Sequence, residues 1–360
     1  MLSIYSFLYL YKVLSQQNFS EKIITWYEQH HRDLPWRKTQ NPYYIWLSEV
    51  ILQQTRVKQG LPYYERFVET YPTVADLANA PEDEVFRLWQ GLGYYSRAKN
   101  MLHTAKIIHQ EYQDVFPNTY KELIKLKGIG KYTAAAIASF AFQESVAVLD
   151  GNVYRVLARY FGISTDIASP QGAKEFGKLS QELLPEKKSH VYNQAIMEFG
   201  AIQCSPQKPD CMYCPLRENC YAYNHHKQQE LPIKINKLKI KERFFAYAIF
   251  ENEERIALKK RTGKDIWQNL YDFHLIELTS LEDLNSFIDT AWANSEITIG
   301  KISSIYKHQL THQKIFIRFF HIQIQNAQLL TSFSQELQFF DKDEAHKLPK
   351  PILIANYLLE

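Results

Sequence analysis

All four cysteines of this 360-residue chain lie in one short stretch, CSPQKPDCMYCPLRENC, which runs from Cys204 to Cys220. Two disulfides could close loops there, but disulfide frameworks belong to small secreted domains, and a chain of this length can bury a core without them. A zinc site usually takes its thiolates from two close pairs. Here the spacing is Cys204-x6-Cys211-x2-Cys214-x5-Cys220, one close pair with a more distant cysteine on each side. This spacing favours a [4Fe–4S] cluster held by all four thiolates, with zinc and disulfides as the alternatives.

The overall charge does not by itself require a nucleic-acid partner. The formal net charge is +3 and the sequence pI is about 8.4, so a nucleic acid would have to be bound by local basic clusters. Residues 1–18 begin with an apolar run, but this run has no basic residues before it and no small-residue cleavage site, and it is too short to span a bilayer. We interpret residues 1–18 as an extension, disordered or from an overlong start. We expect a cytoplasmic chain without a membrane partner, associated with the nucleoid in a bacterium.

The hydrophobic pattern divides the rest of the chain into a helical part and a mixed part. Residues 19–230 are predicted to be all-α, because apolar residues recur every three or four positions. The clearest helical segments are Pro42–Val57, Pro81–Tyr112, Asn152–Gly162 and His190–Ile202. Residues 231–242 form a lysine-rich linker, and residues 243–360 are predicted to form a smaller α/β domain. Its predicted elements are strands at Arg243–Glu251, Arg255–Arg261 and Lys314–Gln325 and a helix at Ser280–Ala293 with Ser280 as its N-cap.

A glycine-containing turn lies between two helical segments in LKGIGKYTAAAIASFAF, which spans Leu126–Phe142. Gly128 and Gly130 would let the backbone approach a ligand closely, and amides at the start of a helix bind anions. With Lys131 beside them, they fit a helix–hairpin–helix that holds a DNA phosphate without reading bases. An ordinary helix corner with a glycine C-cap fits this stretch equally well.

Two carboxylates stand out as candidates for chemistry. Asp150 follows the apolar run SVAVL and precedes a helix, where it or Asn152 could simply be an N-cap. The helix dipole would also keep such a carboxylate ionised, which suits a group that stabilises a developing positive charge. Glu49 lies in the middle of a helix among apolar neighbours. Burial there would raise the pKa of Glu49 and suit it to act as a general acid, unless it lies on a wet edge of the helix.

The order of these features resembles that of the helix–hairpin–helix DNA glycosylases. LPWR, SEVILQQTRV, GLGYYSRAKN, LDGNV and CPLRENC are more specifically similar to the MutY-type adenine DNA glycosylases, from about Phe19 to the end of the chain. The endonuclease III type carries a lysine just after the hairpin, which attacks the sugar and cleaves the strand. Tyr132 occupies that position here and cannot form a Schiff base, and endonuclease III also lacks a glutamate like Glu49. The resemblance therefore implies a monofunctional hydrolase of N-glycosyl bonds.

The resemblance also implies a role for each site residue. Glu49 would protonate N7 of a flipped adenine and later activate water, while Asp150 would stabilise the sugar cation. Tyr132 would hydrogen-bond near the sugar and position Asp150, with Asn152 in support. The implied DNA contacts are Arg37, Leu52 and Gln194 at the flipped base, Gln54 and Tyr94 wedged around the opposite base, and Gly128, Gly130 and Lys131 at the backbone. One [4Fe–4S] cluster on Cys204, Cys211, Cys214 and Cys220 would shape a loop that presents Lys208 and Arg217 to phosphates.

Residues 243–360 resemble the Nudix-like module that senses 8-oxoguanine in this family, through DIWQNLYDF and YKHQLTHQK. No acidic R-E-x-x-E-E pattern occurs there, so we expect no phosphohydrolase activity. The family's recognition loop commonly reads Phe-Ser-His, whereas this chain reads Leu310-Thr311-His312. Thr311 and His312 still offer a hydroxyl and a ring nitrogen.

The sequence therefore predicts an all-α helix–hairpin–helix glycosylase region with a [4Fe–4S] loop at 204–220, followed by a smaller α/β Nudix-like domain. The expected partner is double-stranded DNA with an 8-oxoguanine:adenine or guanine:adenine mispair, bound by a monomer. The alternatives are an endonuclease III-like glycosylase/lyase for oxidised pyrimidines, a catalytically silent DNA-damage-binding protein, and a zinc-dependent DNA-binding module. Lys237, Lys239 and Lys241 of the linker could follow the DNA, although a lysine-rich linker is usually only solvated.

Overall fold

The prediction of an all-α first part is confirmed, because residues 18–235 contain no strand in the computed structural model. The structure describes residues 18–235, 240–288, 292 and 296–359. They form two compact units. The first contains the described residues up to Ala78 and those from His103 to 235, and the second contains Asn79–Leu102 and the described residues from 240 onwards. Residues 1–17 of the predicted extension, and Lys237 and Lys239 of the predicted linker, lie outside the described residues.

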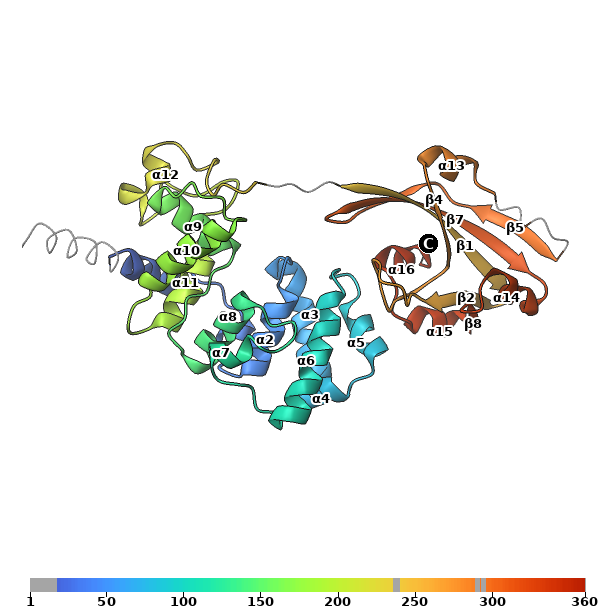
Figure 1. Ribbon diagram of the computed structural model, residues 1–360, viewed down its shortest axis with the longest axis horizontal. Helices are drawn as coiled ribbons and strands as arrows, with labels where there is room; N and C mark the ends of the chain where they lie inside the picture. The colour runs from blue at the N-terminus through green and yellow to red at the C-terminus, as the bar shows by residue number, and fades with distance from the viewer. Residues whose placement is uncertain (1–17, 236–239, 289–291, 293–295, 360) are drawn as a thin grey trace, which may run out of the picture. The chain divides into compact units, whose positions relative to one another are not determined.

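Helices build the first unit (Figure 1). The chain is helical over residues 18–30. The elements that follow are η1 (Pro35–Arg37), α2 (Pro42–Ile51), α3 (Val57–Thr70), α4 (Val74–Asn79), α7 (Tyr120–Leu123), α8 (Lys131–Phe142), α9 (Gly151–Phe161), α10 (Pro170–Glu182), α11 (Ser189–Ile202), η2 (Arg217–Asn219) and α12 (Tyr221–Asn224). Helix α2 packs on α8, and α9 packs on α11. Helices α8 and α9, which carry predicted site residues in their first turns, are therefore each held against a second helix.

Two predicted helical segments are shorter than expected because turns interrupt them. The segment Pro42–Val57 ends as a helix at Ile51, and α3 begins at Val57. The segment Pro81–Tyr112 forms two helices, α5 (Glu82–Trp89) and α6 (Ser96–Tyr112). Between them, Gly91, Gly93 and Tyr94 have φ angles of 104°, 69° and 48°, a left-handed conformation that ends a helix.

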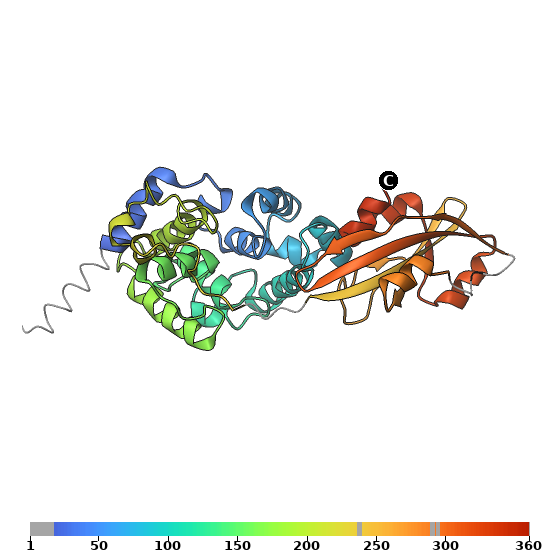
Figure 2. The same cartoon turned by 90° about the horizontal axis from the view of Figure 1, so that it is seen from above.

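A mixed sheet builds most of the second unit (Figure 2). Its strands are β1 (Lys241–Asn252), β2 (Arg255–Lys260), β3 (Tyr271–Asp272), β4 (His274–Leu278), β5 (Ile297–Ile302), β6 (Tyr306–Gln309), β7 (Gln313–Ile324) and β8 (Gln338–Asp341). The order is β3-β2-β1-β7-β5, with β4 on β1, β6 on β7 and β8 on β2. The long strands β1 and β7 are parallel, with Lys241 opposite Gln313 and Glu251 opposite Gln323.

Both faces of this sheet are covered by helices, which confirms the prediction of an α/β second part. Ala246, Ala248 and Phe250 of β1 pack on one face with α13 (Leu281–Ser286) and α14 (Leu330–Phe333). Phe245, Tyr247 and Ile249 pack on the other face with α15 (Lys342–Lys347) and α16 (Ile352–Tyr357). A strand buried on both faces reads as a continuous apolar run, as β1 does.

The remaining sequence-based boundaries differ in small ways. Strand β1 begins at Lys241, two residues before the predicted domain start. Ser280 caps its helix as predicted by accepting a hydrogen bond from the amide of Asp283, but α13 ends at Ser286. No described helix is long and apolar enough to cross a membrane.

Candidate active site and cysteine loop

One pocket of about 990 Å³ in the first unit brings together eight of the predicted site residues. They come from four helices and the loops beside them. They are Glu49, Tyr132, Asp150 and Asn152, predicted to be catalytic, and Arg37, Leu52, Gln54 and Gln194, predicted to contact DNA. Lys208 of the cysteine loop also lines this pocket.

Glu49 lies on the inner face of α2 and is only 7% exposed, so it is not on a wet edge of the helix. Burial raises the pKa of Glu49 to about 7, although the hydrogen bond from Tyr132 and the charge of Arg37 act to lower it. The hydroxyl of Tyr132, in the first turn of α8, donates to Oε2 of Glu49 over 2.5 Å. A carboxyl group with a pKa near 7 can hold and release a proton at neutral pH.

Asp150 is the N-cap of α9, and its Oδ1 accepts a hydrogen bond from the amide of Val153 over 2.8 Å. The side-chain amide of Asn152 donates to the other oxygen, Oδ2, over 2.7 Å. Burial by the surrounding protein raises the pKa of Asp150 despite these hydrogen bonds, although the side chain keeps partial exposure. Desolvation of the carboxylate therefore outweighs the hydrogen bonds from Val153 and Asn152, which act to lower its pKa.

The position of Tyr132 also differs from its expected relation to Asp150. Its hydroxyl bonds to Glu49, whereas the side-chain oxygens of Asp150 bond to Asn152 and Val153. The charge of Asp150 is still close enough to contribute to raising the pKa of Tyr132, after burial and the charge of Glu49. Tyr132 is therefore placed to act on the carboxyl group of Glu49.

A buried ion-pair network in the pocket wall was missed from the sequence. Glu198 of α11 is 1% exposed and accepts two hydrogen bonds from the Arg32 guanidinium, over 2.6 and 2.8 Å. Arg37 donates to the same carboxylate over 3.1 Å. Burial acts to raise the pKa of Glu198, but its bonds and charges with Arg32 and Arg37 outweigh burial, and its pKa is lowered. The signal that singled out Glu49, a glutamate among apolar neighbours in a helix, is also present in AIMEFGAI.

The predicted hairpin is a tight, exposed turn before α8. Gly128 has a φ of 84°, which only glycine adopts easily, and Gly130 is the N-cap of α8 without a side-chain cap. Ile129 between them is buried and anchors the turn. Gly128, Gly130 and Lys131 are exposed. Backbone amides at such a helix start can bind a phosphate.

Gln54 in the first unit and Tyr94 in the second share a strained backbone conformation. Their φ angles are 56° and 48°, and both side chains are exposed. Left-handed backbone in residues other than glycine is costly and clusters at functional sites. Within the second unit, the hydroxyls of Tyr94 and Thr311 hydrogen-bond to each other. The structure therefore joins two residues, 217 positions apart in the sequence, that were both predicted to act around the opposite base.

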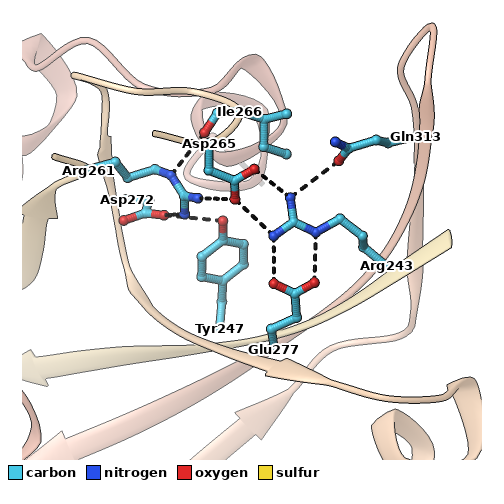
Figure 3. Close-up of polar contacts among 8 residues, drawn as sticks. All are labelled: Arg243, Tyr247, Arg261, Asp265, Ile266, Asp272, Glu277 and Gln313. Carbon is cyan, nitrogen blue, oxygen red and sulfur yellow. Dashed lines mark hydrogen bonds and ion pairs between the residues drawn. The ribbon is translucent and has the colours of Figure 1, made fainter. Parts of the chain in front are cut away.

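A network of charged side chains in the second unit includes Gln313, which directly follows Thr311 and His312 in the sequence (Figure 3). The main-chain oxygen of His312 accepts a hydrogen bond from the amide of Lys241 over 3.0 Å. Gln313, the next residue, accepts a bond from Arg243 over 3.3 Å. Arg243 in turn forms ion pairs with Asp265 over 2.8 Å and with Glu277 over 2.5 Å. Arg261 forms ion pairs with Asp272 over 2.6 Å and with Asp265 over 3.1 Å.

The four cysteines are free and partly buried in one loop, so disulfides are not formed. Three of them, Cys204, Cys214 and Cys220, pack against the helical core. Burial and the nearby sulfurs of Cys204 and Cys220 raise the pKa of Cys211. Arg159 of α9 donates to Sγ of Cys204 over 3.4 Å and to the carbonyls of Ser205 and Pro206 over 2.8 and 2.9 Å.

Four free cysteines in one partly buried loop are, by their chemistry, the type of donor set that holds a polynuclear cluster. The hydrogen bond from Arg159 to a cysteine sulfur is the type of contact that tunes such a cluster. Among the residues that the structure describes, no group of three or more His, Cys, Asp or Glu side chains is arranged to hold a metal ion.

A second arginine of α9 links the cysteine loop to the pocket, and it too was missed from the sequence. Arg155 donates to the carbonyl of Cys204 over 2.8 Å, to Oδ1 of Asn152 over 2.8 Å and to the carbonyl of Gly200 over 2.6 Å. The backbones of α9 and α11 approach closely here, because a Cβ on Gly200 would lie 2.7 Å from Cβ of Asn152 and 2.8 Å from its carbonyl oxygen.

Comparisons with known proteins agree with this architecture. The family described as HhH-GPD superfamily base excision DNA repair protein matches residues 47–186, and the NUDIX domain matches residues 245–360. A thermostable thymine-DNA glycosylase is 31% identical, covers 58% of this chain and 97% of its own, and superposes with a TM-score of 0.55. An endonuclease III bound to DNA, at 22% identity and a TM-score of 0.53, shows the fold alone. The helical part of the chain thus has the helix–hairpin–helix fold of base excision repair proteins.

A more specific relative matches nearly the whole chain, and another matches more than half of it. The adenine DNA glycosylase of Buchnera aphidicola subsp. Baizongia pistaciae is 36% identical over 340 residues, which cover 93% of this chain and 94% of the relative. The human adenine DNA glycosylase is 40% identical over 222 residues, 59% of this chain and 41% of the relative. This chain belongs to the adenine DNA glycosylase family.

Proposed function

We propose that the protein is a monofunctional adenine DNA glycosylase that removes adenine mispaired with 8-oxoguanine, or with guanine, from double-stranded DNA. The observation that carries this proposal is the buried carboxyl group of Glu49, with a pKa of about 7, hydrogen-bonded to Tyr132 in the pocket that Asp150 also lines. The relatives named adenine DNA glycosylase support the choice of adenine.

Adenine leaves its sugar more readily when it is protonated. In the proposed step, the protonated carboxyl of Glu49 donates its proton to N7 while the bond between C1′ and N9 breaks and its electron pair stays with the base. Water then adds to C1′ of the sugar cation, and the Glu49 carboxylate takes a proton from that water. The two partial steps leave free adenine, an abasic site and Glu49 in its starting state.

Asp150 is proposed to stabilise the sugar cation through its negative charge. An opposite charge within a few ångström favours the ionised form of a carboxyl group. The developing cation would therefore oppose the desolvation that raises the pKa of Asp150 in the DNA-free protein. Asn152 and the amide of Val153 hold both oxygens of Asp150 in place for this role.

A strand-cleaving lyase step needs an amine nucleophile, and the position after the hairpin holds Tyr132 instead of lysine. The hydroxyl of Tyr132 is committed to Glu49. This favours base removal without strand cleavage over the endonuclease III-like alternative.

The proposed contacts to DNA follow from exposure and backbone geometry. The amides of the Gly128–Lys131 turn would bind a phosphate, and the strained Gln54 and Tyr94 would fill the space left by the flipped adenine. Thr311 and His312 would recognise 8-oxoguanine opposite the adenine, in a loop supported by Gln313 and Arg243.

We further propose that Cys204, Cys211, Cys214 and Cys220 hold one [4Fe–4S] cluster. The cluster would supply structural and electrostatic support to the loop when it is bound, since base removal needs no electron transfer. Arg155 and Arg159 would hold the loop against α9, and Lys208 would face the DNA. Visible absorbance together with iron and sulfide analysis would distinguish the cluster from zinc.

Two duplexes test the proposed function. One carries an 8-oxoguanine:adenine pair and the other an oxidised pyrimidine, and strand breaks are scored with and without hot alkali. We expect alkali-dependent breaks at the adenine of the first duplex only. Breaks without alkali in the second duplex would support the lyase alternative, and binding without any product would support a silent damage-binding protein.

A further inference from the structure

We infer that Tyr27 is a positioning residue that fixes the amide of Gln194 with its NH2 group toward the pocket, so that Gln194 donates to an acceptor atom of the bound base. In adenine this acceptor is a ring nitrogen and not the amino group. The inference rests on the proposed function, because it assumes that the pocket receives adenine.

The series of hydrogen bonds that ends at Gln194 begins at a buried carboxylate. Glu198 accepts hydrogen bonds from Arg32 and from Nη2 of Arg37. These bonds hold the guanidinium of Arg37 against the wall of the pocket. The other terminal nitrogen of Arg37, Nη1, then donates to the hydroxyl oxygen of Tyr27 over 2.9 Å and lies 3.4 Å from the carbonyl oxygen of Gln194.

The hydrogen bond from Arg37 fixes the direction of the hydrogen bond between Tyr27 and Gln194. A guanidinium has donors and no acceptor, so the oxygen of Tyr27 must accept from Arg37. The single proton of the Tyr27 hydroxyl is then available for the side chain of Gln194, whose Oε1 lies 3.0 Å away. An amide nitrogen could not accept this proton. These hydrogen bonds therefore orient the Gln194 amide with its oxygen toward Tyr27.

This orientation leaves the NH2 group of Gln194 for the pocket, which Gln194 lines. Tyr27 is only 8% exposed, so water does not easily replace its hydroxyl in this chain of bonds. Without that hydroxyl the amide could rotate and present its oxygen to the base. An NH2 group recognises ring nitrogens and carbonyl oxygens, whereas an amide oxygen recognises amino groups. The direction of these hydrogen bonds therefore makes the pocket favour a base that has an acceptor atom facing Gln194.

A double-mutant cycle with two substrates tests this inference. Single-turnover base release is measured at subsaturating enzyme for wild type, Tyr27→Phe, Gln194→Ala and the double variant. The substrates carry adenine, or purine without its amino group, opposite 8-oxoguanine. Tyr43→Phe is the matched control, because its buried hydroxyl also makes one hydrogen bond, to the carbonyl of Tyr71 over 2.7 Å, and Tyr43 does not line the pocket. Thermal melting of each variant reports any loss of folded protein.

We expect Tyr27→Phe to slow release about tenfold, the value of one hydrogen bond, with an equal factor for adenine and purine. We expect no further loss when Tyr27→Phe is added to Gln194→Ala, and wild-type rates for Tyr43→Phe. A Tyr27→Phe effect that disappears with purine would mean that Gln194 accepts from the amino group, and would overturn the inference. So would additive effects in the cycle, or a wild-type rate for Tyr27→Phe. If the wild type released no adenine, the proposed function itself would fail.

Discussion

The hydroxyl of Tyr132 donates a 2.5 Å hydrogen bond to the carboxylate of Glu49, which lies 83 positions earlier in the chain. Two effects of opposite sign therefore act on one carboxyl group. Burial raises the pKa of Glu49, and the hydrogen bond from Tyr132 acts to lower it. Burial has the larger effect, and the resulting pKa is about 7. The general-acid role thus depends on a balance that single substitutions can shift.

The rate of adenine release should fall as the pH rises through the pKa of Glu49. Only the protonated form donates, so we expect a decline of about tenfold per pH unit above about pH 7. Tyr132→Phe removes the bond that stabilises the carboxylate, so the pKa of Glu49 should rise and the decline should begin at higher pH. Single-turnover rates between pH 5 and about 9 measure both curves. A decline that begins at lower pH in Tyr132→Phe would show that the bond does not favour the carboxylate.

Glu49→Gln should stabilise the folded protein at alkaline pH. The pKa of Glu49 is raised from 4.5 to about 7, so the folded state binds the proton more tightly than the unfolded chain does. The stability that this provides is complete below pH 4.5 and is lost as the pH rises to about 7. For wild type, the free energy of unfolding falls by about 3 kcal/mol over this pH range. Glutamine does not titrate, so the Glu49→Gln variant does not show this fall.

Urea unfolding at pH 5 and at pH 8 measures this difference in the free energy of unfolding between Glu49→Gln and wild type. The gain in stability should be much larger at the higher pH. Glu69→Gln is the control, because Glu69 is exposed on α3 and its replacement should change little at either pH. Equal gains at both pH values would contradict the raised pKa of Glu49.

Gly200→Ala should displace Asn152 and slow adenine release. The added Cβ would lie less than 3 Å from the backbone of Asn152, and such overpacking costs about 1–3 kcal/mol. Gly177→Ala in α10 is the matched control, because nothing lies within 4 Å of its added Cβ. It should stabilise the protein by about 0.5–1 kcal/mol. Thermal melting and release rates are measured for both variants. Equal behaviour of the two variants would contradict the close approach of Gly200 to Asn152.

Replacing Thr311 and His312 by alanine should weaken the preference for 8-oxoguanine over guanine opposite the adenine. Tyr94→Phe should do the same to a smaller extent, because it removes the hydroxyl that meets Thr311. The measured quantity is the ratio of single-turnover rates on the two mispairs. Rates that fall equally on both mispairs would show that the loop only supports folding.

Local patterns in the sequence predicted the features that depend on neighbouring residues. The periodicity predicted α9 and α11 to within a residue at each end, and the long strands β1 and β7 were also identified. The N-cap positions of Asp150 and Ser280 were both correct. The setting of Glu49 among apolar residues correctly indicated its burial.

Features that depend on distant residues were missed. Arg32 and Glu198 are 166 positions apart, and Tyr27 and Gln194 are 167 apart, so no local pattern links them. The break between α5 and α6 depends on the left-handed backbone of Gly91, Gly93 and Tyr94, which periodicity alone does not reveal. The raised pKa of Asp150 follows from burial in the folded pocket. The residue preferences of helix N-caps do not predict this burial.

The central claim is that Glu49 supplies the proton that releases adenine. Its most direct test is single-turnover release from an 8-oxoguanine:adenine duplex by wild type, Glu49→Gln and the control Glu69→Gln, with duplex affinity measured in parallel. We expect Glu49→Gln to bind the duplex normally and to release no adenine, and Glu69→Gln to match wild type. Adenine release by Glu49→Gln at the wild-type rate would contradict this claim.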